Sequence, residues 1–331
     1  MQSRRIAIAQ IAPRLGDLEE NLTRHHELLG TARSEGADLV VFPELGLTGY
    51  LLQDLAGEVA MRLDDPRLAE LAAATRDLSV VASFVEESAD HRLFISAGLF
   101  EDGELRHLHR KLFLPTYGLF DERRFFAAGD ALRAVDSRLG AGIGIAVCED
   151  FWHLAVPQLL ALDGAQILIN VSSSPGRDLA ATNEVGLGTA TSWRTLMRTY
   201  AQLTTSFVIF CNRVGVEESI SFWGGSEVIS PSGEVLFGAP LYDEGLFTVD
   251  ISLGDIRRER IVLPLLRDER PELQIRELGR IVAERAGMAP DTTASIEEAA
   301  LAEPGLAEPR LGERRPAERR LRVADGGKGR S

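Results

Sequence analysis

Cys148 follows an apolar run, residues 143–147, and precedes the acidic pair Glu149 and Asp150. A helix-like segment, residues 154–162, comes next. This pattern predicts a thiol exposed at a turn from a strand into a helix. The positive end of a helix can lower the pKa of a thiol placed there, and the thiolate is the nucleophilic form of cysteine. We therefore predict that Cys148 is a usable nucleophile near neutral pH.

Two other apolar runs end near ionisable residues, Glu44 and Lys111. Attack on an amide requires a deprotonated nucleophile, a stabilised oxyanion and a protonated leaving nitrogen. A carboxylate can move the protons, while an ammonium and a backbone N–H hold the oxyanion. Glu44, Lys111 and Cys148 supply these groups at strand ends, where α/β sites are commonly built. Spacing alone is weak evidence, because any chain of this length contains these residue types.

The sequence predicts both strands and helices around these groups. Apolar and alternating runs predict strands at residues 5–10, 39–42, 79–85, 93–100, 143–147, 166–171, 207–211, 227–229 and 246–249. Leu18, Leu22, Leu29 and Ala32 share one helical face, and residues 66–78 and 188–203 also predict helices. The pair Asp102-Gly103 suits a tight hairpin turn. We therefore predict an α/β fold with mixed sheets covered by helices.

Composition narrows the class of protein. The 331 residues, 45% of them hydrophobic and 26% charged, are typical of a globular chain that buries a sizeable core. The net charge of −14 argues against general nucleic-acid binding. No apolar stretch approaches the roughly 20 residues needed to span a bilayer, and no signal-peptide pattern begins the chain. Two cysteines suit a reducing compartment, and we predict a cytoplasmic protein that binds no membrane.

Short motifs around the three candidate groups carry a family resemblance. These are FPEL at 42–45, KLFLPTYG at 111–118, FDERRF at 120–125, VCED at 147–150, CNRVG at 211–215 and FWGGS at 222–226. They resemble the carbon-nitrogen hydrolases of the nitrilase superfamily, over residues 4 to about 270. The segments LPTY and FDER most resemble the glutamine-hydrolysing domain of glutamine-dependent NAD synthetases.

This resemblance implies an αββα sandwich that pairs with a second subunit to give αββα-αββα. It also implies a role for each matching position. Cys148 would be the nucleophile, Glu44 the general acid and base, and Lys111 the cation that stabilises the tetrahedral intermediate. Glu122 matches a second carboxylate that orients the lysine. A structural ion pair with Arg123 or Arg124 is the alternative for Glu122.

The same resemblance implies a substrate pocket. Tyr117 would help to form it, and Glu149 would meet the α-amino group of the substrate and supply a backbone N–H to the oxyanion. For Tyr117 a packed aromatic is the alternative. The synthetase domain of the NAD synthetases, with its pyrophosphate loop, has no counterpart in these 331 residues. The ammonia released is therefore expected to be used outside this chain, which leaves the glutamine specificity open.

The domain organisation is predicted from the extent of the resemblance and from the composition of the C-terminal residues. We predict a hydrolase domain at residues 1–270 and a C-terminal extension at residues 271–286 that can lie at the subunit interface. The remainder, residues 287–331, is rich in Ala, Pro, Glu and Arg and predicts a disordered tail, because it cannot bury enough apolar surface to offset the ordering entropy.

Other candidates for chemistry are weaker. Cys211 lies within an apolar run and predicts buried packing. His107 and His109 would share one face of a strand, as in a metal site, but no third ligand with suitable spacing is near, so we predict that both are exposed. His25 and its neighbour His26 are predicted at the surface of the first helix. We predict neither a metal nor a cofactor.

Taken together, these residues predict a metal-free thiol amidase that acts through a thioester acyl-enzyme and releases ammonia. Glutamine or a related ω-amide is the favoured substrate. With the same site, the substrate could instead be an N-carbamoyl amino acid, an aliphatic amide or a nitrile. A scaffold, or an ammonia-donating subunit of a separate synthetase, is the alternative of a different class. The expected partners are a small amide, further copies of this chain in a homodimer or larger homo-oligomer, and a separate ammonia-using enzyme.

Overall fold

The computed structural model describes residues 3–176 and 188–285. The predicted tail, residues 287–331, lies outside them. The described chain divides after Pro264 into two compact units. The second contains two helices, α7 (Leu265–Asp268) and α8 (Pro271–Arg285). The predicted boundary near residue 270 and the interfacial role of the extension stay predictions.

Two six-stranded sheets form the first unit. One sheet has the order β14-β1-β2-β3-β4-β5 and the other has the order β13-β12-β9-β8-β7-β6. The strands of the first are β1 (Ser3–Gln10), β2 (Leu39–Val41), β3 (Ser79–Glu87), β4 (Leu93–Glu101), β5 (Glu104–Arg110) and β14 (Gly245–Ser252). Those of the second are β6 (Ala134–Asp136), β7 (Gly142–Val147), β8 (Ile167–Ser172), β9 (Phe207–Asn212), β12 (Glu227–Ile229) and β13 (Val235–Gly238). The hairpin of β10 (Val214–Glu217) and β11 (Ile220–Trp223) stands apart.

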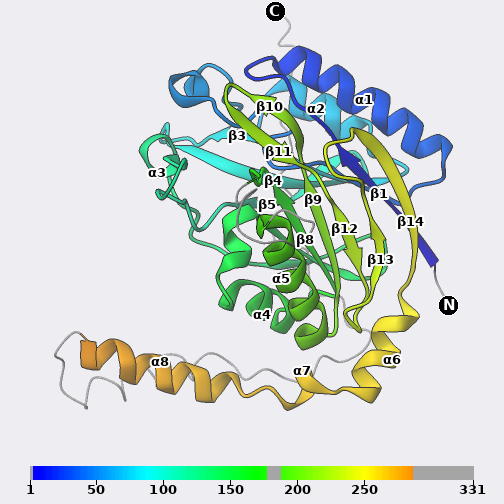
Figure 1. Ribbon diagram of the computed structural model, residues 1–331, viewed down its shortest axis with the longest axis vertical. Coiled ribbons are helices and arrows are strands. Elements are labelled where there is room, and N and C mark those ends of the chain that lie inside the picture. The colour runs from blue at the N-terminus through cyan, green and yellow to red at the C-terminus, as the bar shows by residue number, and fades with distance from the viewer. Residues whose placement is uncertain (1–2, 177–187, 286–331) are drawn as a thin grey trace, which may run out of the picture. The chain divides into compact units, whose positions relative to one another are not determined.

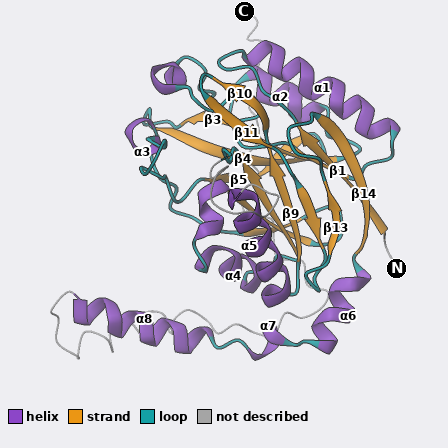
Figure 2. Ribbon diagram, viewed as in Figure 1, coloured by secondary structure: helices purple, strands orange, loops and turns teal. Residues whose placement is uncertain are grey.

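Helices cover the outer faces of the two sheets. The helices α1 (Leu18–Ser34) and α2 (Pro66–Ala73) lie on the first sheet, and α4 (Ala155–Leu162) and α5 (Gly188–Thr204) lie on the second (Figure 1). The sheets face each other, with β4 against β7 and β1 against β9. Figure 2 shows the strands between the two helical layers. The predicted αββα sandwich is confirmed. The other helices of this unit are η1 (Gln53–Gly57), α3 (Glu122–Phe125), η2 (Cys148–Trp152) and α6 (Gly254–Val262).

The hydrophobic pattern explains the layers. Strands β2, β7, β8 and β9 are buried along their whole length, as expected for parallel strands covered on both faces, and their sequences are nearly continuous apolar runs. On α1 the predicted apolar face is buried, including Leu18, Leu22 and Leu29. His25 lies on that same face and is fully buried, so its predicted exposure is wrong.

Strand direction brings the candidate groups to one edge of each sheet. Strands β1, β2 and β3 are parallel, and β5 runs in the same direction because it is antiparallel to β4, which is antiparallel to β3. The hairpin that reverses β4 into β5 has the predicted turn, with positive φ at Asp102 and Gly103. Glu44 after β2 and Lys111 after β5 therefore lie at the same edge. In the second sheet, β7 and β8 are parallel and end at Val147 and Ser172, so that Cys148 directly follows β7.

Within the described part of the chain, no helix combines the length and the apolar character needed to cross a membrane.

Candidate active site

A buried ammonium lies between two buried carboxylates. Lys111 Nζ donates to Glu44 Oε1 at 2.8 Å and to Glu122 Oε1 at 2.8 Å. All three side chains are almost completely removed from solvent. The structure therefore brings three of the six predicted site residues into direct contact. Glu122 pairs with Lys111, and this contact takes the place of the alternative pairing with Arg123 or Arg124.

The charges of this cluster are strongly coupled. Burial by itself lowers the pKa of Lys111, but the charges of Glu122 and Glu44 outweigh burial and raise that pKa well above its usual value. Burial also raises the pKa of Glu122 to about 7, with a further contribution from the charge of Glu44 and an opposing one from Lys111. Shifts of this kind, caused by burial and by neighbouring charges, cluster at functional sites of proteins.

Backbone contacts fix the carboxylate of Glu44. The Ser173 backbone N–H donates to Glu44 Oε2 at 2.7 Å, and the Ser173 hydroxyl donates to the Glu44 carbonyl at 2.9 Å. The next residue, Leu45, has a positive φ of 49°, and its N–H donates to Ser83 Oγ at 3.0 Å. Ser173 follows β8 of the second sheet, so Glu44 is held by groups from both sheets.

Cys148 stands directly after β7 with a φ of 43°, a left-handed conformation that costs a non-glycine residue energy. Its predicted exposure is wrong, because only 7% of the residue is accessible. Burial and the nearby Glu44 carboxylate raise the pKa of the thiol, while Lys111 opposes them. Cys148 is itself the first residue of helix η2, which is only five residues long and carries the acidic residues Glu149 and Asp150 in its first turn. The lowered pKa expected from a helix N-terminus is therefore also wrong.

Tyr117 and Glu149 form a second, more open pair. The Tyr117 hydroxyl donates to Glu149 Oε2 at 2.8 Å. Tyr117 is 51% exposed and its ring meets Phe120 edge to face at 5.5 Å. Glu149 is half-buried, and burial raises its pKa while the Tyr117 hydroxyl opposes that shift. Because Glu149 adjoins Cys148 in the chain, this pair lies beside the thiol.

Tyr50 also contacts the buried cluster, although nothing in its sequence context predicts it. Its hydroxyl donates to Glu122 Oε1 at 2.6 Å, so this oxygen accepts from both Tyr50 and Lys111. The backbone N–H groups of Tyr50 and Leu51 donate to the buried Glu217, which pairs with Arg213. Tyr50 comes six residues after Glu44 in the motif-free segment GLTGYL, which gave no chemical signal.

The predicted exposure of His107 and His109 is wrong. His109 is buried and lies 2.8 Å from the carboxylate of Asp150. His107 is mostly buried, and burial lowers its pKa to about 4. A strand that carries two imidazoles looked solvent-facing, but β5 contacts β7 of the facing sheet. The prediction for Cys211 is confirmed, because that residue is fully buried within β9.

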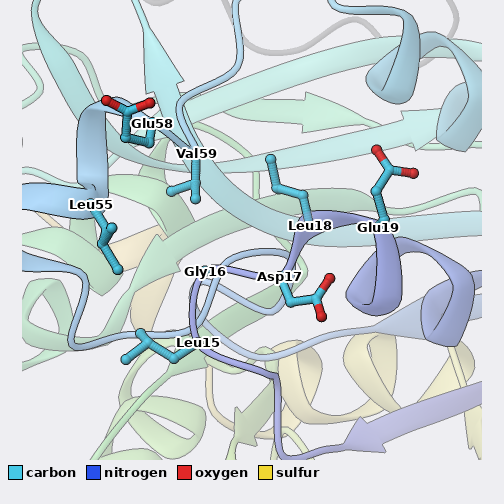
Figure 3. Close-up of a pocket in the computed structure, with 8 residues that line it drawn as sticks. All are labelled: Leu15, Gly16, Asp17, Leu18, Glu19, Leu55, Glu58 and Val59. Atoms are coloured by element: carbon cyan, nitrogen blue, oxygen red, sulfur yellow. The ribbon is translucent and has the colours of Figure 1, made fainter.

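Among the described residues, no group of three or more His, Cys, Asp or Glu side chains is arranged to hold a metal ion. A surface hollow of about 540 Å³ lies between the start of α1 and η1 (Figure 3). It is lined by Leu15, Gly16, Asp17, Leu18, Glu19, Leu55, Glu58 and Val59. None of the six candidate site residues borders it.

Comparison with known proteins agrees with this geometry. The carbon-nitrogen hydrolase family matches residues 5–260, which is most of the chain. The chain belongs to the carbon-nitrogen hydrolase family. This carbon-nitrogen hydrolase is 35% identical over 271 residues to a glutamine-dependent NAD(+) synthetase of Thermotoga maritima, a match that covers 81% of this chain and 45% of that protein. The chain spans about half the length of the curated relatives it matches.

Solved structures support the same assignment. A carbon-nitrogen hydrolase from Helicobacter pylori G27 is similar with a TM-score of 0.72 and 28% identity, over 82% of this chain and 97% of that one. A mutant of the Nesterenkonia AN1 amidase from the nitrilase superfamily is similar with a TM-score of 0.68 and 25% identity, over 82% and 95%. The resemblance predicted from short motifs is therefore confirmed, and the protein is a carbon-nitrogen hydrolase.

Proposed function

We propose that this protein is a cysteine amidase that hydrolyses the side-chain amide of glutamine or a related α-amino ω-amide. One observation carries the proposal. The Lys111 ammonium is held between the carboxylates of Glu44 and Glu122, and the charges of this cluster act on the Cys148 thiol. In this arrangement Cys148 is the nucleophile, Glu44 the general acid and base, and Glu122 the group that orients Lys111.

The raised pKa of Cys148 sets the order of proton transfers. The resting thiol keeps its proton, so Glu44 takes that proton as sulfur attacks the amide carbon. Lys111 and the Glu149 backbone N–H stabilise the developing oxyanion. Glu44 then donates the proton to the leaving nitrogen, and ammonia and a thioester result. In the second half of the reaction Glu44 deprotonates water, which attacks the thioester and releases the carboxylic acid and the free thiol.

The Tyr117–Glu149 pair supports an α-amino substrate. An ammonium group that enters a half-buried site needs a carboxylate partner, because an unpaired buried charge is costly. Glu149 offers that carboxylate, and the Tyr117 hydroxyl holds it at 2.8 Å. The similarity to glutamine-dependent NAD(+) synthetases favours glutamine within this class.

The proposal extends to partners. Ammonia released here would serve a separate ammonia-using enzyme, as the similarity to glutamine-dependent synthetases suggests. We also propose a homodimer and a cytoplasmic location. Size-exclusion chromatography with light scattering on the full chain tests the homodimer, and cell fractionation tests the location.

A substrate panel tests the activity itself. Ammonia release is measured with L-glutamine, an N-carbamoyl amino acid, a simple aliphatic amide and a nitrile, each with the wild-type protein and with Cys148→Ala. The expected result is a higher kcat/KM for L-glutamine than for the others, with no turnover by the variant. A preference for the aliphatic amide would reject glutamine as the substrate but leave the cysteine mechanism standing. Full activity of Cys148→Ala would reject the mechanism.

A further inference from the structure

The carboxylate of Asp150 connects the chain segments that carry the ammonium and the thiol. Its Oδ1 accepts from the backbone N–H groups of Leu112 at 2.9 Å and Phe113 at 3.0 Å. Its Oδ2 accepts from the Val147 N–H at 3.0 Å and lies 2.8 Å from His109 Nε2. Asp150 is fully buried. All four partners are thus gathered on one carboxylate away from solvent.

These partners adjoin the two reacting groups. Leu112 follows Lys111 directly, and Val147 directly precedes Cys148. Lys111 belongs to the end of the first sheet and Cys148 to the end of the second. Glu44 and Ser173 already connect Lys111 to the second sheet. Asp150 adds a polar link between the segments that carry Lys111 and Cys148 themselves.

His109 is the side-chain partner of this link. It lies two residues before Lys111, near the end of β5, and its side chain is almost fully buried. Both oxygens of Asp150 accept backbone N–H groups, so the carboxylate is an acceptor and the proton of the contact belongs to His109 Nε2. A buried carboxylate that loses one of its donors moves or takes up a proton to offset the loss.

We propose that His109 and Asp150 form a positioning pair that sets the Lys111 ammonium relative to the Cys148 thiol. This inference rests on the proposed function, since it assigns the pair to the amidase site. His109 touches no reacting atom and acts through Asp150. Its removal should therefore slow the chemical steps and leave substrate binding nearly unchanged.

The test uses variants of His109 and a matched control on the same strand. His109→Phe keeps an aromatic ring without the donor. His109→Gln restores a donor near the position of Nε2, and His109→Asn is too short to reach Asp150 and serves if the Phe variant does not fold. His107→Phe is the control, because His107 Nε2 has no hydrogen-bond partner among the described residues.

Two readouts are measured for each variant in full-length protein. The first is kcat and KM for L-glutamine. The second is the rate at which iodoacetamide alkylates Cys148, followed by intact mass in a Cys211→Ala background. His109→Phe should lower kcat by about 10- to 100-fold, the loss typical of a small displacement of reacting groups, with KM within about twofold. Alkylation should slow by a similar factor, whereas His109→Gln and His107→Phe should stay near wild type.

Three results would overturn the positioning role: a kcat of His109→Phe within twofold of wild type, equal losses for His109→Phe and His109→Gln, or an equal loss for His107→Phe. Failure of the proposed function is recognised separately, because the wild-type protein would then release no ammonia from any amide. In that case the alkylation rates alone decide, and slower labelling in His109→Phe with recovery in His109→Gln still supports the pair.

Discussion

The site contains two side-chain pairs whose hydrogen bonds have the same length but whose surroundings differ. Lys111 and Glu44 meet at 2.8 Å in an interior that excludes water, and each follows a strand. Tyr117 and Glu149 also meet at 2.8 Å, but Tyr117 is 51% exposed and stands in a segment without regular structure. Lys111 and Glu44 therefore lie just after strands of one sheet, whereas Tyr117 lies on a loop and Glu149 lies in the short helix η2.

The difference in burial between the two pairs determines how much each pair contributes to stability. Charges in a low-dielectric interior act strongly on one another, and loss of one partner leaves the others uncompensated. A hydrogen bond at a half-exposed position competes with water and contributes little to stability. Changes in the first pair should therefore alter both catalysis and stability. Changes in the second should alter selectivity with the fold intact.

The largest effect on activity is expected from replacing Cys148, and Cys211 is its control. Both cysteines are buried, but their neighbours differ. Cys148→Ala should abolish turnover, since no thioester can form, and Cys211→Ala should retain most activity. The buried cluster acts on Cys148, while Cys211 Sγ lies 3.3 Å from the Val41 carbonyl inside the sandwich. Ammonia release by the two variants decides the comparison. Equal activity in both would place the nucleophile elsewhere.

The next effect concerns the buried cation. Lys111→Met should lower kcat by orders of magnitude, because the oxyanion loses its positive partner. It should also lower Tm at neutral pH, since Glu44 and Glu122 would then face each other without a cation. Glu44→Gln should cause a similar loss in kcat with a smaller loss in Tm. Steady-state kinetics gives kcat and thermal melts give Tm for each variant. An unchanged Tm for Lys111→Met would argue against strong coupling in the cluster.

Much of this cluster was predictable from the sequence. The strands were visible as apolar runs, and short motifs identified Glu44, Lys111 and Cys148. The contacts of Tyr50 with Glu122 and of His109 with Asp150 were not, because neither Tyr50 nor His109 lies in a motif and each contact joins segments that are distant in the sequence. Such contacts depend on how distant segments pack in three dimensions, which periodicity does not specify.

The errors in exposure have separate physical reasons. His25 lies three residues after Leu22 and four before Leu29, so its position on the apolar face was readable, but its polar type suggested the surface. In the structure its ring stacks on Phe42 at 3.9 Å, and Nδ1 lies 2.7 Å from the Asn21 carbonyl. For Cys148, the turn was predicted correctly, whereas burial of the thiol follows from the facing sheet.

A moderate effect is expected from the pH dependence of stability. The pKa of Glu122 is about 7 in the folded protein, above its usual 4.5. The folded state therefore holds this proton more tightly than the unfolded state does. Its contribution to stability is fully present below pH 4.5 and is lost as pH rises toward 7. Relative to Glu122→Gln, the wild-type Tm should thus fall over that range, and parallel Tm curves for the two proteins would reject the shift.

The smallest effect is expected at the open pair. Glu149→Gln should raise KM for L-glutamine more than for an amide without an α-amino group, because only the former needs the carboxylate. Tyr117→Phe removes the hydroxyl that holds Glu149 and should raise the same KM roughly two- to tenfold, the size of one lost hydrogen bond. The measurement is kcat and KM for both substrates, and equal losses for the two would reject α-amino recognition.

The pH profile of Tyr117→Phe sharpens this last prediction. The Tyr117 hydroxyl holds the pKa of Glu149 down against the effect of burial, so its removal should raise that pKa further. Only the ionised carboxylate binds an ammonium group, and binding is lost as pH falls through the pKa. In Tyr117→Phe the rise in KM for L-glutamine should therefore begin at a higher pH than in the wild-type protein. An unchanged profile would show that the hydroxyl contacts Glu149 without controlling its charge, and recognition would then depend on the carboxylate alone.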